Sequence, residues 1–331
     1  MRTRPEFCFP CQPLRWLMGL TLLSLVTLAP DPASTEGALM PRYASGQVDI
    51  HNPSRVDVAL VLAVDVSSSV KSHERRFQRE AYAAALADPR VASMALGGGA
   101  GRVAISYMEW SGRHYQRVHL PMRIMSTPEQ LATFAADILA IEDRNADPMY
   151  VQPTAIGNAL LAAEQVMATL NVPARDYVID ISGDGVLNDG MGILAVRDQL
   201  LAMGLTVNGL PIEITHGETN TDRTALDRVS HYYEDCVIGG PGAFHLVARG
   251  FEDVRETLIM KLMLEMAEMQ PDERSQIAQA WNQSDDGVVA QILPANMIEL
   301  APPGGSAPQR RAPADCGETR VSSANPFMIV P

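Results

Sequence analysis

The sequence is poor in basic side chains: 26 Lys and Arg stand against 39 Asp and Glu, which gives a formal net charge of −13. Binding to a nucleic-acid backbone depends largely on basic side chains that displace counterions. No Lys/Arg-rich face is visible, so nucleic acid is excluded as a partner. Hydrophobic residues make up 47% of the chain and charged residues 20%, which is enough for a sizeable core and excludes wholesale disorder.

Long hydrophobic runs are also missing. The apolar run at 16–29 is too short for a comfortable membrane span. Three arginines precede it and a Pro/Ser/Thr-rich stretch follows, as in an export signal. We expect residues 1–30 to be a signal peptide or an N-terminal anchor and residues 31–54 a linker. The protein body is then exported to the periplasm or the extracellular space, either free or tethered to the membrane by this segment.

Cysteine is rare, with four in the chain. Cys8 and Cys11 have CxxC spacing, but they fall in the presumed signal without a βαβ context, which disfavours a redox role. Cys236 and Cys316 could form a disulfide in an oxidising compartment. A buried free thiol at Cys236 is an equally open interpretation.

Motifs of common enzymes are absent. There is no GxSxG elbow, and none of the seven histidines is spaced as a pair of metal ligands. The segments 65–76 and 180–191 resemble calcium loops at their start but lack the final bidentate Glu. The glycine runs 97–101 and 239–242 lack the context of nucleotide-binding loops. With no general base or nucleophile in view, we expect no enzymatic activity.

Strand-length apolar runs alternate with segments of helical periodicity between residues 55 and 270. We expect strands at 56–64, 102–110, 115–120, 176–182, 206–214 and 243–247, and helices at 73–87, 127–141, 155–170, 193–203, 224–233 and 251–269. This order predicts an α/β fold with a doubly wound, mostly parallel sheet and helices on both faces. The hairpin 102–120 supplies one antiparallel edge strand. Residues 271–331 form a Pro-rich, largely irregular tail with one short helix at 272–281.

Two of the predicted strands end abruptly in acidic, hydroxyl-rich or glycine-rich turns. The stretch LVLAVDVSSSV places Asp65, Ser67 and Ser69 after one strand, and SGDG places Asp184 after another. In open α/β sheets ligands bind beyond the carboxyl ends of the strands. The loop before the 155–170 helix brings Thr154 to the same edge. These five oxygen-bearing side chains suit Mg²⁺ or Mn²⁺ and leave one coordination position open.

Simpler interpretations of the same residues stay open. Ser67, Ser69 and Ser72 are also good turn and N-cap residues for the helix that follows. Thr154 is equally suited to capping the next helix. Asp184, between two glycines, is most simply a turn aspartate. Their joint occurrence at matching strand ends favours the metal site.

These motifs resemble the von Willebrand factor A-type (integrin I-like) family, whose metal-ion-dependent adhesion site is DxSxS plus a distant Thr and Asp. The resemblance assigns Asp65, Ser67 and Ser69 to DxSxS, with Thr154 in PTAIGNAL and Asp184 in SGDG as the remaining ligands. The blocks ERRFQREAYAAAL, MEWSG, DISGDG and VIGGPGAF look like a bacterial secreted subfamily of uncharacterised function. The resemblance covers roughly residues 56–267.

Two departures from the family pattern concern the surroundings of the ligands. Val70 stands where many members have Met, and Gln152 and Pro153 stand where glycines are usual. Neither change removes an oxygen ligand, but the second alters the loop that carries Thr154.

Together these features predict an exported, metal-dependent protein-binding module of the adhesion type. The metal would complete its coordination with an Asp or Glu carboxylate of a protein partner. A metal-independent structural subunit of a cell-envelope assembly is the alternative from another class. A metal-dependent hydrolase is a third, which lacks a visible base.

Overall fold

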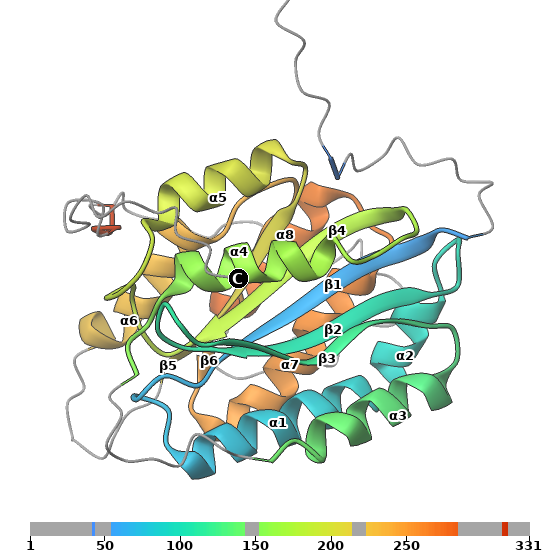
Figure 1. Cartoon of the computed structure of the whole chain (residues 1–331), viewed down its shortest axis with the longest axis horizontal. Coiled ribbons are helices and arrows are strands. Elements are labelled where there is room, and N and C mark those ends of the chain that lie inside the picture. Colours follow the sequence, from blue (N-terminus) through green and yellow to red (C-terminus); the bar gives the residue numbers. More distant parts are fainter. Residues whose placement is uncertain (1–41, 44–53, 143–151, 214–222, 284–312, 317–331) are drawn as a thin grey trace, which may run out of the picture. The chain divides into compact units, whose positions relative to one another are not determined.

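The computed structural model describes residues 42–43, 54–142, 152–213, 223–283 and 313–316. A six-stranded sheet in the order β3-β2-β1-β4-β5-β6 forms its centre (Figure 1). The strands are β1 (Val56–Asp65), β2 (Val103–Trp110), β3 (Gln116–Met125), β4 (Ala174–Gly183), β5 (Thr206–Glu213) and β6 (Ala248–Arg249). All neighbours are parallel except β2 and β3. The predicted fold class, with its antiparallel edge strand, is confirmed.

Helices pack on both faces of this sheet (Figure 1). They are α1 (Ser72–Leu86), α2 (Pro89–Leu96), α3 (Pro128–Leu139), α4 (Ile156–Met167), α5 (Ile193–Ala202), α6 (Arg223–Tyr232), α7 (Phe251–Met266) and α8 (Pro271–Gln283), with a π-helical turn η1 (Tyr233–Val237) after α6. The ten residues of β1 are all buried. Leu60 and Leu62 pack in the core of α1, α2, α3, α7 and α8, whereas Val61 and Ala63 pack in the core of α4, α5 and η1.

Several elements differ from the expected ones. Asp88 and Pro89 end the first helix as expected, but they also begin α2, which the sequence analysis missed. The Asp88 side chain accepts the N–H of Arg90 at 2.8 Å, and proline suits the first helical position because its missing N–H is not needed there. Strand β3 continues past the expected end through Pro121 to Met125, which an edge strand tolerates.

The last strand is also displaced from its expected position at 243–247. Phe244 donates its N–H to the side chain of Asn208 at 3.1 Å, outside the ladder. His245 meets β5 in a single bridge to Gly209. Regular pairing starts only at Ala248, so β6 is Ala248–Arg249.

Cys236 in η1 and Cys316 form a disulfide. This settles the choice between a disulfide and a free thiol that the sequence left open. The N–H of Ala314 donates to the Asp235 carboxylate at 2.7 Å, so a short piece of the tail is held against η1. The expected export signal with Cys8 and Cys11, most of the linker and most of the tail lie outside the described residues. Among those described, no helix has the length and apolar character to cross a membrane.

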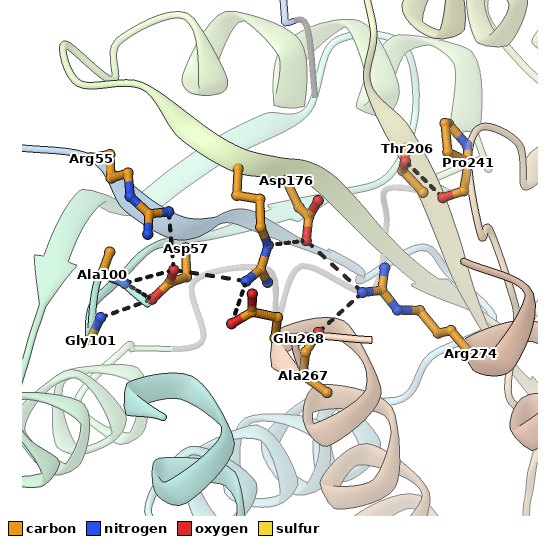
Figure 2. A network of polar contacts seen from close by, with 11 residues as sticks. Arg55, Asp57, Ala100, Gly101, Asp176, Thr206, Pro241, Ala267, Glu268 and Arg274 are labelled. Atoms are coloured by element: carbon orange, nitrogen blue, oxygen red, sulfur yellow. Dashed lines mark hydrogen bonds and ion pairs between the residues drawn. The ribbon is translucent and has the colours of Figure 1, made fainter. Parts of the chain in front are cut away.

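A network of charged groups lies at the amino end of β1 and β4 (Figure 2). Asp57 accepts the backbone N–H groups of Ala100 and Gly101 at 2.9 Å and pairs with Arg55 at 3.4 Å. A Cβ on Gly98 would lie 2.6 Å from the Asp57 carboxyl carbon. The glycine run before β2 is therefore a turn that wraps a buried carboxylate.

A second charged cluster is buried between β4 and α7. Lys261 is 0% exposed, as are Asp180 and Glu265. Its Nζ lies 2.8 Å from Oδ1 of Asp180 and contacts the Glu265 carboxylate. Burial opposes the charge on Lys261, but the two carboxylates outweigh it and raise the pKa of the amine. Burial and the nearby Asp180 raise the pKa of Glu265 to about 7.

We therefore expect Lys261→Met to lower the free energy of unfolding by about 3–5 kcal/mol, because it leaves buried carboxylates without their cation. Urea denaturation measures this change. The matched control is Arg76→Met, which removes an exposed pair with Glu80 and should cost less than about 1 kcal/mol. If the two substitutions lowered the free energy of unfolding equally, the conclusion that Lys261 stabilises the buried carboxylates would be contradicted.

Candidate metal centre

The ends of β1 and β4 lie next to each other at the carboxyl edge of the sheet. Val64 pairs with Ser182 in the parallel ladder, so Asp65 leaves β1 beside the turn that carries Asp184. On its other side Asp65 pairs with Trp110 at the end of β2. The loop between β1 and α1 and the loop between β4 and α5 therefore start from the same point.

Hydrogen bonds connect four of the five predicted ligands. The N–H of Ser67 donates to Oδ1 of Asp65 at 2.7 Å. The hydroxyl oxygens of Ser67 and Ser69 are 3.0 Å apart. Ser69 then donates to Oδ1 of Asp184 at 2.6 Å. The structure thus joins side chains from two strand ends into one continuous set of oxygens.

Thr154 reaches the same place through the loop before α4. A Cβ on Gly185 would lie 3.4 Å from Oγ1 of Thr154, so this hydroxyl lies close to the glycine next to Asp184. The N–H of Thr154 donates to Oδ1 of Asn188 at 2.8 Å, which fixes the loop against the turn after β4. Thr154 is buried, at 4% exposure.

Helix capping does not account for these residues. The N-cap of α1 is Lys71, whose N–H donates to Oε2 of Glu74 at 2.7 Å. The N-cap of α4 is Ala155. The capping interpretation is therefore wrong for Ser67, Ser69 and Thr154. Ser67 does form a turn, because its carbonyl accepts the N–H of Val70 at 3.0 Å.

The departure from glycine before Thr154 is compensated by side-chain contacts. The carbonyl of Gln152 accepts the N–H and the hydroxyl of Ser68, each at 2.9 Å. Its side-chain oxygen accepts the hydroxyl of Ser111 at 2.6 Å. Gln152 thus ties the threonine loop to the serine loop and to the end of β2.

Burial divides the site into a closed floor and an open rim. Asp65 and Ser67 are 0% and 1% exposed, whereas Ser69 is exposed and Asp184 half-buried. Burial, followed by the charge of Asp184, raises the pKa of Asp65 to about 8, although hydrogen bonds from Ser67 act in the opposite direction. Oδ2 of Asp65 has no hydrogen-bond partner in the described part of the chain.

The residues fit a hard divalent cation. A buried carboxylate oxygen without a donor lies beside three hydroxyl groups and a second carboxylate, and oxygen ligands of this kind suit Mg²⁺ or Mn²⁺. Across the described residues, no group of three or more His, Cys, Asp or Glu side chains that could hold a metal ion is found. Coordination of a metal by Asp65, Ser67, Ser69, Thr154 and Asp184 stays a prediction.

Two residues near the site carried no recognisable signal in the sequence. Arg113, in the turn between β2 and β3, donates its N–H and its Nε to the carboxylate of Asp189 at 2.9 Å and 2.7 Å. This pair holds the hairpin against the turn after β4. Tyr233 of η1 places its hydroxyl beside Asp65, as described below. Both contacts join segments far apart in the sequence, so only the folded chain reveals them.

Residues 55–270 match the family described as "Protein of unknown function (DUF1194)". The chain belongs to this family. Among curated proteins no match was found. The family description carries no activity, so it leaves the chemistry of the site to be argued from its geometry.

Several solved structures show a distant similarity to this DUF1194 protein. Proximal thread matrix protein 1 from the mussel byssus is 17% identical, with 64% of this chain and 48% of that chain covered and a TM-score of 0.43. The structure of the same protein with a zinc-occupied MIDAS motif is 18% identical, with 63% of this chain and 48% of that chain covered and a TM-score of 0.42. The pilus adhesin SpaC from Lactobacillus rhamnosus GG is 12% identical, with 64% of this chain and 30% of that chain covered and a TM-score of 0.43. The chain spans about half the length of the mussel protein, and at these identities the similarity concerns the fold alone.

A buried ion pair holds α1, the helix that follows the serine loop, against β2. Nε and one terminal nitrogen of Arg79 donate to the Glu109 carboxylate at 2.6 Å and 3.0 Å. Nε2 of His119 lies 3.0 Å from the same carboxylate. Burial alone raises the pKa of Glu109, but His119 and Arg79 outweigh it and lower the value from 4.5 to about 2.

This shift predicts a pH dependence of stability. The folded chain favours ionised Glu109, so its contribution is complete above the unfolded-chain pKa of 4.5 and is lost as the pH falls toward 2. The loss amounts to about 3 kcal/mol. Urea denaturation between pH 6 and about pH 2 should show a free energy of unfolding that falls by this much more in wild type than in Glu109→Gln. Parallel pH profiles would contradict the assignment.

Proposed function

We propose that this protein is an exported module that binds a protein partner through a divalent cation, Mg²⁺ or Mn²⁺, held by Asp65, Ser67, Ser69, Thr154 and Asp184. The observation that carries the proposal is the orphaned Oδ2 of buried Asp65 within a connected set of hydroxyl and carboxylate oxygens. A carboxylate removed from water and left without a donor is costly unless a positive charge lies beside it.

The composition of the site supports a docking role. A bound cation would act as a Lewis acid that accepts an oxygen from outside the chain. Three of its five protein ligands are neutral hydroxyls, which do not reduce the positive charge of the ion. An Asp or Glu carboxylate of the partner suits the remaining position. The ion also reverses the local field in a chain of net charge −13, which allows an acidic protein to bind an acidic group.

A binding role is favoured over an enzymatic one by the partners of these side chains. The hydrogen bonds given above connect the ligands only to one another, to backbone groups and to Asn188. None of them involves a histidine or lysine that could serve as a general base.

Export is supported by the arginine-preceded apolar segment at the N-terminus. The disulfide between Cys236 and Cys316 is of the kind that persists in oxidising compartments such as the periplasm. We therefore place the A-type domain outside the cytoplasm, with the N-terminal segment as its signal or tether.

One observation favours the alternative, a metal-independent subunit of an envelope assembly. Ser69 already donates to Asp184 at 2.6 Å, so these two side chains at the open rim bind each other without a cation. In that case the partner would bind to another surface of the domain, and chelation would leave the complex intact.

The two functions differ in their response to metal. We expect saturating Mg²⁺ or Mn²⁺ to raise the melting temperature of the wild-type chain by several degrees, because a ligand present at 100 times its Kd stabilises by about 2.7 kcal/mol. Asp65→Asn should abolish this rise. Asp88→Asn, which removes a carboxylate that caps α2, is the control and should retain it.

A pull-down from cell-envelope extract then tests the partner. Wild-type protein should retain a protein partner in Mg²⁺ and release it in chelator, and Asp65→Asn should retain none under either condition. A partner that stays bound in chelator, or the same melting temperature with and without metal, would contradict the metal-dependent function.

A further inference from the structure

The hydroxyl of Tyr233 is a buried polar group that the ligand set leaves unexplained. Tyr233 is 0% exposed and packs with Val61 and Ala63 in the core under α4 and α5. Its oxygen has no hydrogen-bond partner within the part of the chain that the structure describes. Burial of a hydroxyl without a partner is unfavourable, and a phenylalanine would fill the same space without this cost.

The hydroxyl lies next to the orphaned oxygen of the metal centre. A Cβ built on Gly183 would lie 2.8 Å from Oδ2 of Asp65 and also 2.8 Å from the oxygen of Tyr233. One methyl group at this position would therefore collide with both atoms. The absence of a side chain at Gly183 leaves a shared space with a donor on one side and an acceptor on the other.

We propose that Tyr233 is a positioning residue of the metal centre, whose O–H donates to Oδ2 of Asp65 when that carboxylate holds the proposed cation. This inference rests on the proposed function. Oδ1 of Asp65 is already held by the N–H of Ser67. A second donor on Oδ2 fixes the plane of the carboxylate, as outer partners of metal ligands commonly do.

A phenol is well matched to this task. It orients the carboxylate without adding a positive charge, so Asp65 keeps its negative charge for the cation. Tyr233 begins the π-helical turn η1, in which its carbonyl accepts the N–H of Ile238 at 3.0 Å. Cys236 of the same turn is tied to Cys316 by the disulfide. The segment that carries the hydroxyl is therefore fixed both by a backbone hydrogen bond and by a disulfide.

The test compares Tyr233→Phe with Tyr232→Phe in the full chain, using MgCl₂ as the probe in isothermal titration calorimetry. Tyr232 is the preceding residue and is also buried. We expect the Kd for Mg²⁺ to weaken about 10-fold in Tyr233→Phe and to stay within about twofold of wild type in Tyr232→Phe. The melting temperature of metal-free Tyr233→Phe should equal or exceed that of wild type, because an unpaired hydroxyl is removed.

A second readout separates positioning from packing. Mg²⁺ should produce a tyrosine ultraviolet difference spectrum in wild type and Tyr232→Phe, as a phenol begins to donate to a carboxylate, and none in Tyr233→Phe. If Tyr233→Phe binds Mg²⁺ like wild type while Asp65→Asn does not bind, this inference fails and the proposed function stands. If wild type binds neither Mg²⁺ nor Mn²⁺, both fail. A weaker Kd accompanied by a lower metal-free melting temperature would also overturn the inference, since it indicates lost packing.

Discussion

The carboxylate of Asp65, buried at the end of a strand covered on both faces, is the constraint on which the carboxyl edge of this sheet depends. Burial and the nearby Asp184 raise its pKa to about 8, so the surroundings resist the charge that a metal ligand must carry. The neighbouring groups are neutral dipoles. The N–H of Ser67 donates to Oδ1 of Asp65, and the hydroxyls of Ser67 and Ser69 continue the hydrogen-bonded set to Asp184. Dipoles lower the cost of the charge without cancelling it, so the site stays suited to a cation from solution.

The loops around Asp65 are held by contacts that do not need an ion. Gln152 binds the serine loop and Ser111, and Arg113 clamps the turn after β4 through Asp189. The buried pair of Arg79 and Glu109 fixes α1 behind the serine loop. A site assembled in advance loses less conformational entropy when the ligand binds. In this chain, therefore, the scaffold would contribute to the affinity for the proposed cation, although none of these residues is expected to touch it.

Much of this arrangement could be predicted from sequence, because it depends on local patterns. Continuous apolar runs identified β1 and β4 as central parallel strands, and topology then brought Asp65 and Asp184 together. Residues that fit two local structures were predicted less well. Asp88 was expected only to end one helix, but its side chain also caps α2. The proximity of Tyr233 to Asp65 could not be predicted, because it depends on a π-helical turn and on the missing side chain of Gly183. Neither leaves a periodic signal in the sequence.

Three buried aspartates of the sheet differ in the positive charge that the chain places beside them. Asp57, at the amino end of β1, is neutralised by Arg55 and two backbone N–H groups. Asp180, within β4, has Lys261 at 2.8 Å. Asp65 shares their burial, yet the hydrogen bonds and ion pairs described for it include no Arg or Lys. A buried carboxylate without a cation is strongly unfavourable. Asp57 and Asp180 thus have a cation of the chain itself beside them, whereas Asp65 lies where three loops converge, the place at which the proposed cation would bind.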